Sequence, residues 1–175
     1  NDGSSAQTLN SNIEQGSAGL SYAQSADYSF VYYLGDVGYD QYNVFASYLN
    51  AAIAADPNLI QTFVDNGWRI VLTNQDLDYL IFGGTSDGVE GATYFPQKTI
   101  YVNAGEYSYC VVHELGHFLD YVQGFVSDSA EFANIYYAEG ANLTAYGQTS
   151  VEEFFAEIYS YLVMQPDTAY GYCPQ

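Results

Sequence analysis

The sequence predicts a single-domain α+β fold with a small mixed sheet, a helix that carries two histidines, and a second, acidic helix downstream. The chain has 175 residues of which 49% are hydrophobic, which is enough to bury one core. Short apolar runs typical of strands alternate with stripes of 3.6-residue period typical of helices. We expect residues 1–25, rich in Ser, Asn, Gln and Gly, to form an extension, and residues 26–175 to form the domain.

The first half of the chain predicts two helices between short strands. Residues 28–34 are apolar and aromatic and form a strand or a buried lead-in to the domain. Residues 39–55 carry an apolar helical stripe, and Asp56-Pro57 ends that helix and starts the next one, which Asn66-Gly67 ends. A buried strand over 68–73, a short helix over 76–82 and a glycine-rich loop over 83–88 follow.

The second half predicts a strand pair followed by three helices. Residues 92–95 and 99–102 form the two strands, joined by a turn at 96–98. One helix spans 107–122 and stops at Gly124, and another runs from Ser127 or Asp128 to Glu139. After a loop over 140–147, a helix spans 150–164, with a capping box formed by Ser150 and Glu153.

The charge of the chain excludes polyanions as partners. The chain has two basic residues and 21 acidic ones, which gives it a formal net charge of −19. Nucleic acids and anionic membranes would be repelled, and no apolar run is long enough to span a bilayer. A chain with so few Lys and Arg residues offers few cleavage sites to trypsin-like proteases. We therefore expect a secreted, monomeric protein, although a composition bias of the whole source lineage would give the same charge.

The pattern H-E-x-x-H, formed by His113-Glu114-Leu115-Gly116-His117, predicts a metal site. Residues four apart on a helix have Cβ atoms about 5–6 Å apart, so both imidazoles can reach one Zn²⁺. Glu114 is offset from that face and can act as a general base on a water molecule. His113 and His117 are also the only histidines in the chain.

A third metal ligand is expected on the acidic downstream helix, because two histidines rarely suffice for zinc. Glu153 and Glu157 are four apart and share a helix face. One of these carboxylates can bind the metal while the other orients a histidine through its second ring nitrogen. An alternative is that acidic residues near the helix start merely favour the helix dipole.

Asp120 is a weaker ligand candidate. Ligands at positions 113, 117 and 120 of one helix would diverge from a single metal, so we expect Asp120 to support the site from outside or to be structural. A metzincin would need Gly at 120 and His at 123, where this chain has Asp120 and Gln123, so that class of protease is excluded.

The two cysteines leave two alternatives open. In a secreted chain Cys110 and Cys173 would form a disulfide, which we favour. Cys110 also lies one helical turn before His113, where it can approach the metal; a closed site of that kind would be structural. Asn142-Leu143-Thr144 is a glycosylation sequon, which matters only if the protein is secreted by a eukaryote.

These motifs resemble the catalytic domain of anthrax lethal factor and its relatives, which include the Pro-Pro endopeptidases. The resemblance covers roughly residues 60–165. It is carried by the run from His113 to Asp120, by Tyr146-Gly147, by the run from Glu153 to Glu157, and by the strand pair upstream. It implies a zincin-like metalloprotease fold with His113, His117 and Glu153 as zinc ligands.

The resemblance also implies a mechanism, with Glu114 as general base and Tyr146 as the group that stabilises the oxyanion. A Tyr on a loop just before the ligand helix can donate a hydrogen bond to developing negative charge. We therefore expect a zinc-dependent endopeptidase that acts on peptides or proteins. One strand of the pair forms a sheet edge, where Ala92, Thr93 and Tyr94 hold an extended substrate.

A second hypothesis is a catalytically silent zincin-like module that binds a peptide or protein without cutting it. Every chemical position of the protease is intact, which favours the enzyme.

Overall fold

The computed structural model describes residues 28–84 and 88–173, so the expected extension over 1–25 and part of the loop over 83–88 lie outside the described residues. The described chain forms two compact units. The sheet unit comprises residues 28–47 and 62–110, and the helical unit comprises residues 48–61 and 111–173.

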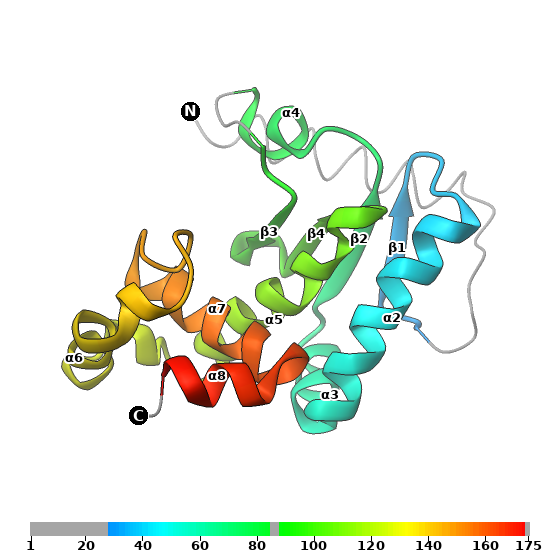
Figure 1. Cartoon of the computed structure of the whole chain (residues 1–175). Helices are drawn as coiled ribbons and strands as arrows, with labels where there is room; N and C mark the ends of the chain where they lie inside the picture. The colour runs from blue at the N-terminus through cyan, green and yellow to red at the C-terminus, as the bar shows by residue number, and fades with distance from the viewer. Residues whose placement is uncertain (1–27, 85–87, 174–175) are drawn as a thin grey trace. The chain divides into compact units, whose positions relative to one another are not determined.

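The sheet unit holds one four-stranded sheet (Figure 1). Its strands are β1 (Val31–Leu34), β2 (Arg69–Thr73), β3 (Gly91–Tyr94) and β4 (Thr99–Asn103), in the order β1-β2-β4-β3. β1 and β4 pair with β2 in parallel, and β3 pairs with β4 in antiparallel. The sheet is therefore mixed, as predicted, and β3 is an edge strand.

The burial of each strand follows its place in the sheet. The central strands β2 and β4 are buried along almost their whole length, and β3 is only half-buried. Leu34, Val71, Leu77 and Tyr101 form a buried cluster of this unit. β3 and β4 are joined by a short 3₁₀ helix (Phe95–Gln97), after which Lys98 adopts a left-handed conformation with φ 50°, so the predicted turn is confirmed.

The predicted helices of the first half are also confirmed. They are α2 (Tyr39–Ala55), α3 (Pro57–Asp65) and α4 (Leu77–Phe82). Asp76 caps α4 by accepting a hydrogen bond from the backbone N–H of Asp78. Gly83 ends α4 in a left-handed conformation, where glycine avoids the steric cost of a Cβ atom.

The helical unit contains residues 48–61 of α2 and α3 together with the helices α5 (Cys110–Val122), α6 (Ala130–Glu139), α7 (Val151–Met164) and α8 (Pro166–Tyr172). The first residue of α5 belongs to the sheet unit. Three short 3₁₀ helices flank them: Glu106–Tyr109, Val126–Asp128 and Gly140–Asn142. The predicted start of the histidine helix was early, because its first turn is the 3₁₀ segment before Cys110. α8 was not predicted, although Pro166 occupies a favoured first helical position.

Aromatic contacts join α6 to α7. Phe132 packs against Phe154 and Phe155, with ring centroids 5.8 Å and 5.3 Å apart, and Tyr136 lies 5.4 Å from Phe154. Phe154 is fully buried. Offset and edge-to-face pairs of this kind stabilise beyond their buried area. They fix one face of α7, so its glutamates are held on a helix of defined orientation.

The predicted disulfide is absent from the structure, in which neither Cys110 nor Cys173 forms a disulfide bond. The buried Sγ of Cys110 lies 3.1 Å from the backbone oxygen of Glu90, to which it donates a hydrogen bond. This contact within the sheet unit gives the Cys110 side chain a partner other than Cys173. The prediction rested on an oxidising compartment rather than on geometry, which is why it went wrong.

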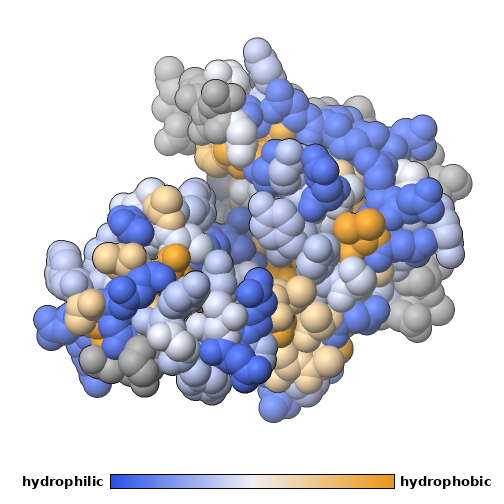
Figure 2. Space-filling model, viewed as in Figure 1, coloured by the Kyte–Doolittle hydropathy of each residue, from blue (hydrophilic) through white to orange (hydrophobic). Residues whose placement is uncertain are grey.

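One face of the molecule is mostly polar. On the face shown in Figure 2, hydrophilic residues predominate and hydrophobic residues occur in small groups. The most exposed large side chains are tyrosines, such as Tyr39, Tyr79 and Tyr137. None of the helices in the described ranges has the length and apolar composition needed to cross a bilayer.

Candidate metal centre

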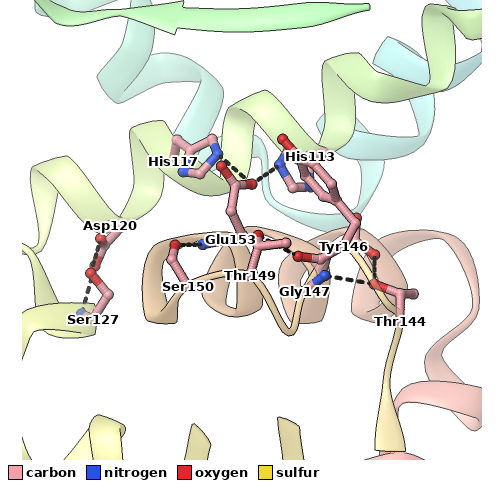
Figure 3. A network of polar contacts seen from close by, with 11 residues as sticks. His113, His117, Asp120, Ser127, Thr144, Tyr146, Gly147, Thr149, Ser150 and Glu153 are labelled. Carbon is pink, nitrogen blue, oxygen red and sulfur yellow. Dashed lines mark hydrogen bonds and ion pairs between the residues drawn. The ribbon is translucent and has the colours of Figure 1, made fainter. Parts of the chain in front are cut away.

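α5 presents His113 and His117 one turn apart on the same face (Figure 3). Their ring centroids are 4.9 Å apart and the rings are almost perpendicular, with an interplanar angle of 82°. His113 is buried and His117 is partly buried. The helical spacing read from the sequence therefore does place both imidazoles together.

α7 brings Glu153 to the same point. Ser150 caps α7 by accepting a hydrogen bond from the backbone N–H of Glu153, which is half of the predicted capping box. The Glu153 carboxylate is directed to the histidines: its Oε2 lies 2.9 Å from His113 Nε2 and 3.4 Å from His117 Nε2. Figure 3 shows Glu153 reaching from α7 toward both imidazoles.

The donor set and its spacing fit zinc. Two imidazole nitrogens and one carboxylate oxygen, from His113, His117 and Glu153, lie within 4.8 Å of one another. A tetrahedral zinc site with bonds of about 2.0–2.1 Å separates neighbouring ligand atoms by about 3.3 Å. The distances from Glu153 Oε2 to the Nε2 atoms of His113 and His117, 2.9 Å and 3.4 Å, lie on either side of that value. Three protein ligands leave a fourth position for water or substrate, the pattern of catalytic rather than structural zinc sites.

Glu157 lies behind His113, on the side away from Glu153. Its Oε1 is 2.9 Å from His113 Nδ1, while His113 Nε2 faces Glu153. A carboxylate on the second nitrogen fixes the orientation and tautomer of a metal-binding imidazole. This arrangement favours Glu153 as the metal ligand and Glu157 as the orienting group, two roles that the helical spacing alone left open between them.

The pKa values reflect this cluster of charges. Burial lowers the pKa of His113, but hydrogen bonds to Glu153 and Glu157 and the charge of Glu114 outweigh burial and raise it to about 10. Burial raises the pKa of Glu153, yet its hydrogen bonds with His113 and His117 bring it down to about 2. In the metal-free site, therefore, a proton on His113 compensates the charge of the carboxylates.

Glu114, which follows His113 on α5, is buried, with 6% of its surface exposed. Its negative charge raises the pKa of both His113 and Tyr146, two residues of the same cluster. A general base must lie near the reacting water, and this placement beside the candidate ligands meets that requirement.

Tyr146 stands over the site from the loop before α7. Its ring centroid lies 5.5 Å from that of His113, and Figure 3 shows the two rings side by side. Burial around its hydroxyl and the charges of Glu153 and Glu114 raise its pKa to about 12, although the residue as a whole is 56% exposed. The hydroxyl therefore keeps its proton at neutral pH and can donate a hydrogen bond.

Hydrogen bonds hold the Tyr146 loop in shape. Thr149 donates to the backbone oxygen of Tyr146 through both its N–H and its hydroxyl, at 3.0 Å and 2.6 Å. Tyr136 of α6 donates to the backbone oxygen of Gln148 at 2.6 Å. These bonds tie the loop to itself and to α6, so Tyr146 is carried on a defined turn.

Thr144 belongs to this site although the sequence analysis gave it no role there. Its hydroxyl lies 2.8 Å from Glu157 Oε2 and accepts a hydrogen bond from the backbone N–H of Gly147. The only sequence signal was its place in the Asn142 sequon. A threonine two residues before the Tyr-Gly pair has no distinctive spacing, so only the folded chain reveals the contact.

Asp120 lies with Ser127 rather than with the histidines. Its two carboxylate oxygens accept hydrogen bonds from the Ser127 N–H at 2.9 Å and from the Ser127 hydroxyl at 2.5 Å. Asp120 is buried, and its backbone oxygen accepts a hydrogen bond from Phe125 N–H. Of the two alternatives for Asp120, the contacts favour the structural one: it fastens the turn that follows α5.

Ala92, Thr93 and Tyr94 lie on β3, the edge strand of the sheet unit. Their predicted position at a sheet edge is confirmed. Their binding of substrate stays a prediction, as do the chemical roles of the histidines, glutamates and Tyr146.

Comparisons with known proteins agree with the resemblance seen in the motifs. Residues 84–170 match a family model described as anthrax toxin lethal factor, N- and C-terminal domain. Lethal factor of Bacillus anthracis is 40% identical over 57 residues, which cover 27% of this chain and 7% of lethal factor. The chain therefore matches only a small part of the length of that relative.

A solved structure shares the fold. The Pro-Pro endopeptidase PPEP-2 of Paenibacillus alvei superposes with a TM-score of 0.65 and 19% sequence identity, covering 83% of this chain and 92% of that one. The zincin-like α+β fold is thus confirmed. The matched family region contains every residue of the candidate metal centre.

Proposed function

We propose that this chain, whose residues 84–170 belong to the anthrax lethal factor family, is a secreted zinc-dependent endopeptidase. The observation that carries the proposal is the convergence of His113, His117 and Glu153, with ligand atoms within 4.8 Å of one another. Glu114 beside them and Tyr146 above them complete a set of groups suited to peptide hydrolysis.

The three converging side chains would hold the metal. His113 and His117 would bind it through Nε2 and Glu153 through Oε2, the atoms that already face one another. Bound zinc would supply Lewis acidity, lowering the pKa of a coordinated water to about 7 and polarising the substrate carbonyl. Glu157 would keep the His113 ring oriented by accepting a hydrogen bond from its Nδ1.

Glu114 would move the proton. Its buried carboxylate would take a proton from the attacking water and then deliver it to the nitrogen of the leaving amine. One residue can perform both steps, because the proton that it gains in the first is the one that it gives in the second. Such general acid–base catalysis is worth about 10²–10⁴-fold in rate.

Tyr146 would stabilise the negative charge that develops on the carbonyl oxygen. With its pKa raised to about 12, the hydroxyl is protonated across the neutral range, as an ordinary tyrosine is, so the group can donate a hydrogen bond to the oxyanion. Loss of one such donor costs on the order of 10²–10³ in kcat.

The distribution of basic residues favours an endopeptidase over a carboxypeptidase. A carboxypeptidase needs a cation to bind the free terminal carboxylate of its substrate. The described residues of the helical unit contain no Lys or Arg. Of the two basic residues of the chain, Arg69 donates to Thr99 and Lys98 donates to the backbone oxygen of Asn66, both within the sheet unit.

An extended substrate would be held at β3. As the edge strand, β3 can pair with a peptide backbone, and its register with β4 fixes which residues point to each face. The net charge of −19 supports an extracellular setting, free of nucleic acids and anionic membranes as partners. We propose that the protein acts as a monomer.

The test is cleavage of a mixed peptide library that includes Pro-Pro bonds, because the name of PPEP-2 describes it as a Pro-Pro endopeptidase. We expect cleavage to stop when a chelator removes zinc and to return when zinc is restored. A silent binding module would retain peptides under both conditions without cutting them, and library peptides that stay intact with zinc bound would favour that alternative.

A further inference from the structure

We propose that Thr144 is a positioning residue of the metal centre, because its hydroxyl joins the Tyr146 turn to the carboxylate that orients His113. The inference rests on the proposed function, since it concerns the same zinc site. The hydroxyl of Thr144 bonds to Glu157 and to the Gly147 backbone, so we expect it to act on the metal ligands through Glu157.

The hydroxyl of Thr144 uses its hydrogen-bonding capacity in two directions. It donates its single hydrogen to Glu157 Oε2 at 2.8 Å and accepts from Gly147 N–H at 2.9 Å. The other oxygen of the same carboxylate, Oε1, lies 2.9 Å from His113 Nδ1. A continuous chain of hydrogen bonds thus runs from the Gly147 backbone to the imidazole.

The space around this chain is tight. A Cβ atom at Gly147 would lie 3.2 Å from Thr144 Oγ1 and 3.4 Å from the Cβ and Cγ atoms of Glu157. Glycine at this position lets the turn pack directly on the Glu157 side chain. The Tyr146-Gly147 pair therefore has a physical reason: the tyrosine faces His113 while the glycine makes room for the carboxylate behind it.

Removing the hydroxyl should loosen the site in a specific way. Glu157 Oε2 would lose its donor and Gly147 N–H would lose its acceptor, so the carboxylate could rotate away from His113 Nδ1. Residues that orient a metal-binding histidine typically contribute about 10–100-fold to metal affinity. Thr144 contacts the orienting residue rather than the histidine, so we expect its loss to weaken zinc affinity by roughly threefold to tenfold.

The test compares Thr144→Val, which keeps the shape of the side chain, with Thr144→Ser, which keeps the hydroxyl. Zinc affinity is measured by competition with a chromophoric chelator, so the readout does not depend on catalysis. We expect Thr144→Val to weaken zinc binding and Thr144→Ser to bind zinc like the wild type. Thr149→Val is the matched control, since its hydroxyl supports the same loop without reaching Glu157, and its zinc affinity should be unchanged.

A double-mutant cycle tests whether Thr144 affects zinc binding through Glu157. In a Glu157→Ala background, Thr144→Val should cause no further loss of zinc affinity, because the residue through which Thr144 acts is gone. Circular dichroism checks that each variant is folded. Thr144→Ala serves as a second hydroxyl-free variant if Thr144→Val does not fold.

The outcomes separate this inference from the proposed function. A wild type that binds zinc while Thr144→Val binds it equally tightly overturns the role of Thr144 alone. The same holds if Thr144→Val weakens zinc binding to the same extent with and without Glu157, or if Thr144→Ser is as weak as Thr144→Val. A wild type without zinc affinity overturns both proposals.

Discussion

Gly116 of α5 packs directly against Ala156 of α7. A Cβ atom at Gly116 would lie 2.7 Å from Ala156 Cα and 3.0 Å from its backbone oxygen. Gly116 stands just before His117, and Ala156 just before Glu157. The backbones of the two helices therefore meet between the residues that form the candidate site. This contact fixes the distance between the helices, and so how closely the histidines of α5 approach the glutamates of α7.

Gly116→Ala should consequently destabilise the protein and weaken zinc binding. Helix propensity alone would make this change favourable by about 1 kcal/mol. Overpacking costs about 1–3 kcal/mol, and because the clash is with the backbone of Ala156 we expect the upper part of that range, which leaves a net cost of about 1–2 kcal/mol. Chemical denaturation measures the free energy of unfolding, and chelator competition measures zinc affinity.

Gly171→Ala is the matched control for that change. Gly171 lies in α8, and a Cβ atom there would meet nothing within 4 Å. We expect this variant to be as stable as the wild type or more stable. If Gly116→Ala behaves in the same way, the close approach of α5 and α7 is contradicted.

The pair of Asp120 and Ser127 should govern stability rather than metal binding. Ser127→Ala leaves one oxygen of the buried Asp120 carboxylate without its hydroxyl donor, at a cost of about 1–3 kcal/mol. Zinc affinity should change little, because the Asp120 carboxylate faces Ser127 and not the histidines. Thermal unfolding and zinc titration of the same variant check both statements, and a large loss of affinity with normal stability would restore Asp120 to a role at the metal.

Zinc binding should release a proton at pH 7.5. The pKa of His113 in the metal-free protein is about 10, so at pH 7.5 its imidazole carries the proton that a metal would displace. We expect release of about one proton per zinc from this residue at pH 7.5, and less as the pH approaches 10. Calorimetric titrations in buffers of different ionisation enthalpy give the number, and binding without proton release would show that His113 is neutral before zinc arrives.

Much of this arrangement could be predicted from the sequence, because its parts are local patterns. The spacing of His113 and His117, and of Glu153 and Glu157, depends only on the helical repeat, and both predicted helices are present, although α5 begins later than predicted. The strand pair before α5 was likewise predicted from short apolar segments on either side of the turn at 96–98.

What escaped prediction depends on contacts between distant segments. The hydrogen bond between Thr144 and Glu157 and the packing of Gly116 on Ala156 join residues with no shared periodicity. The partner of Asp120 could not be found by spacing either, since Ser127 lies beyond the helix end. The predicted disulfide was wrong for a related reason. Composition suggested that Cys110 pairs with Cys173, but the folded chain does not contain this bond.

The central claim is that a zinc ion held by His113, His117 and Glu153 works with Glu114 to hydrolyse peptide bonds. Its most direct test is zinc content and peptide-library cleavage, measured side by side for the wild type and Glu114→Gln. We predict about one zinc per chain in both proteins, with cleavage reduced by about 10²–10⁴-fold in the variant. Zinc absent from both proteins, or equal cleavage by both, would contradict the account.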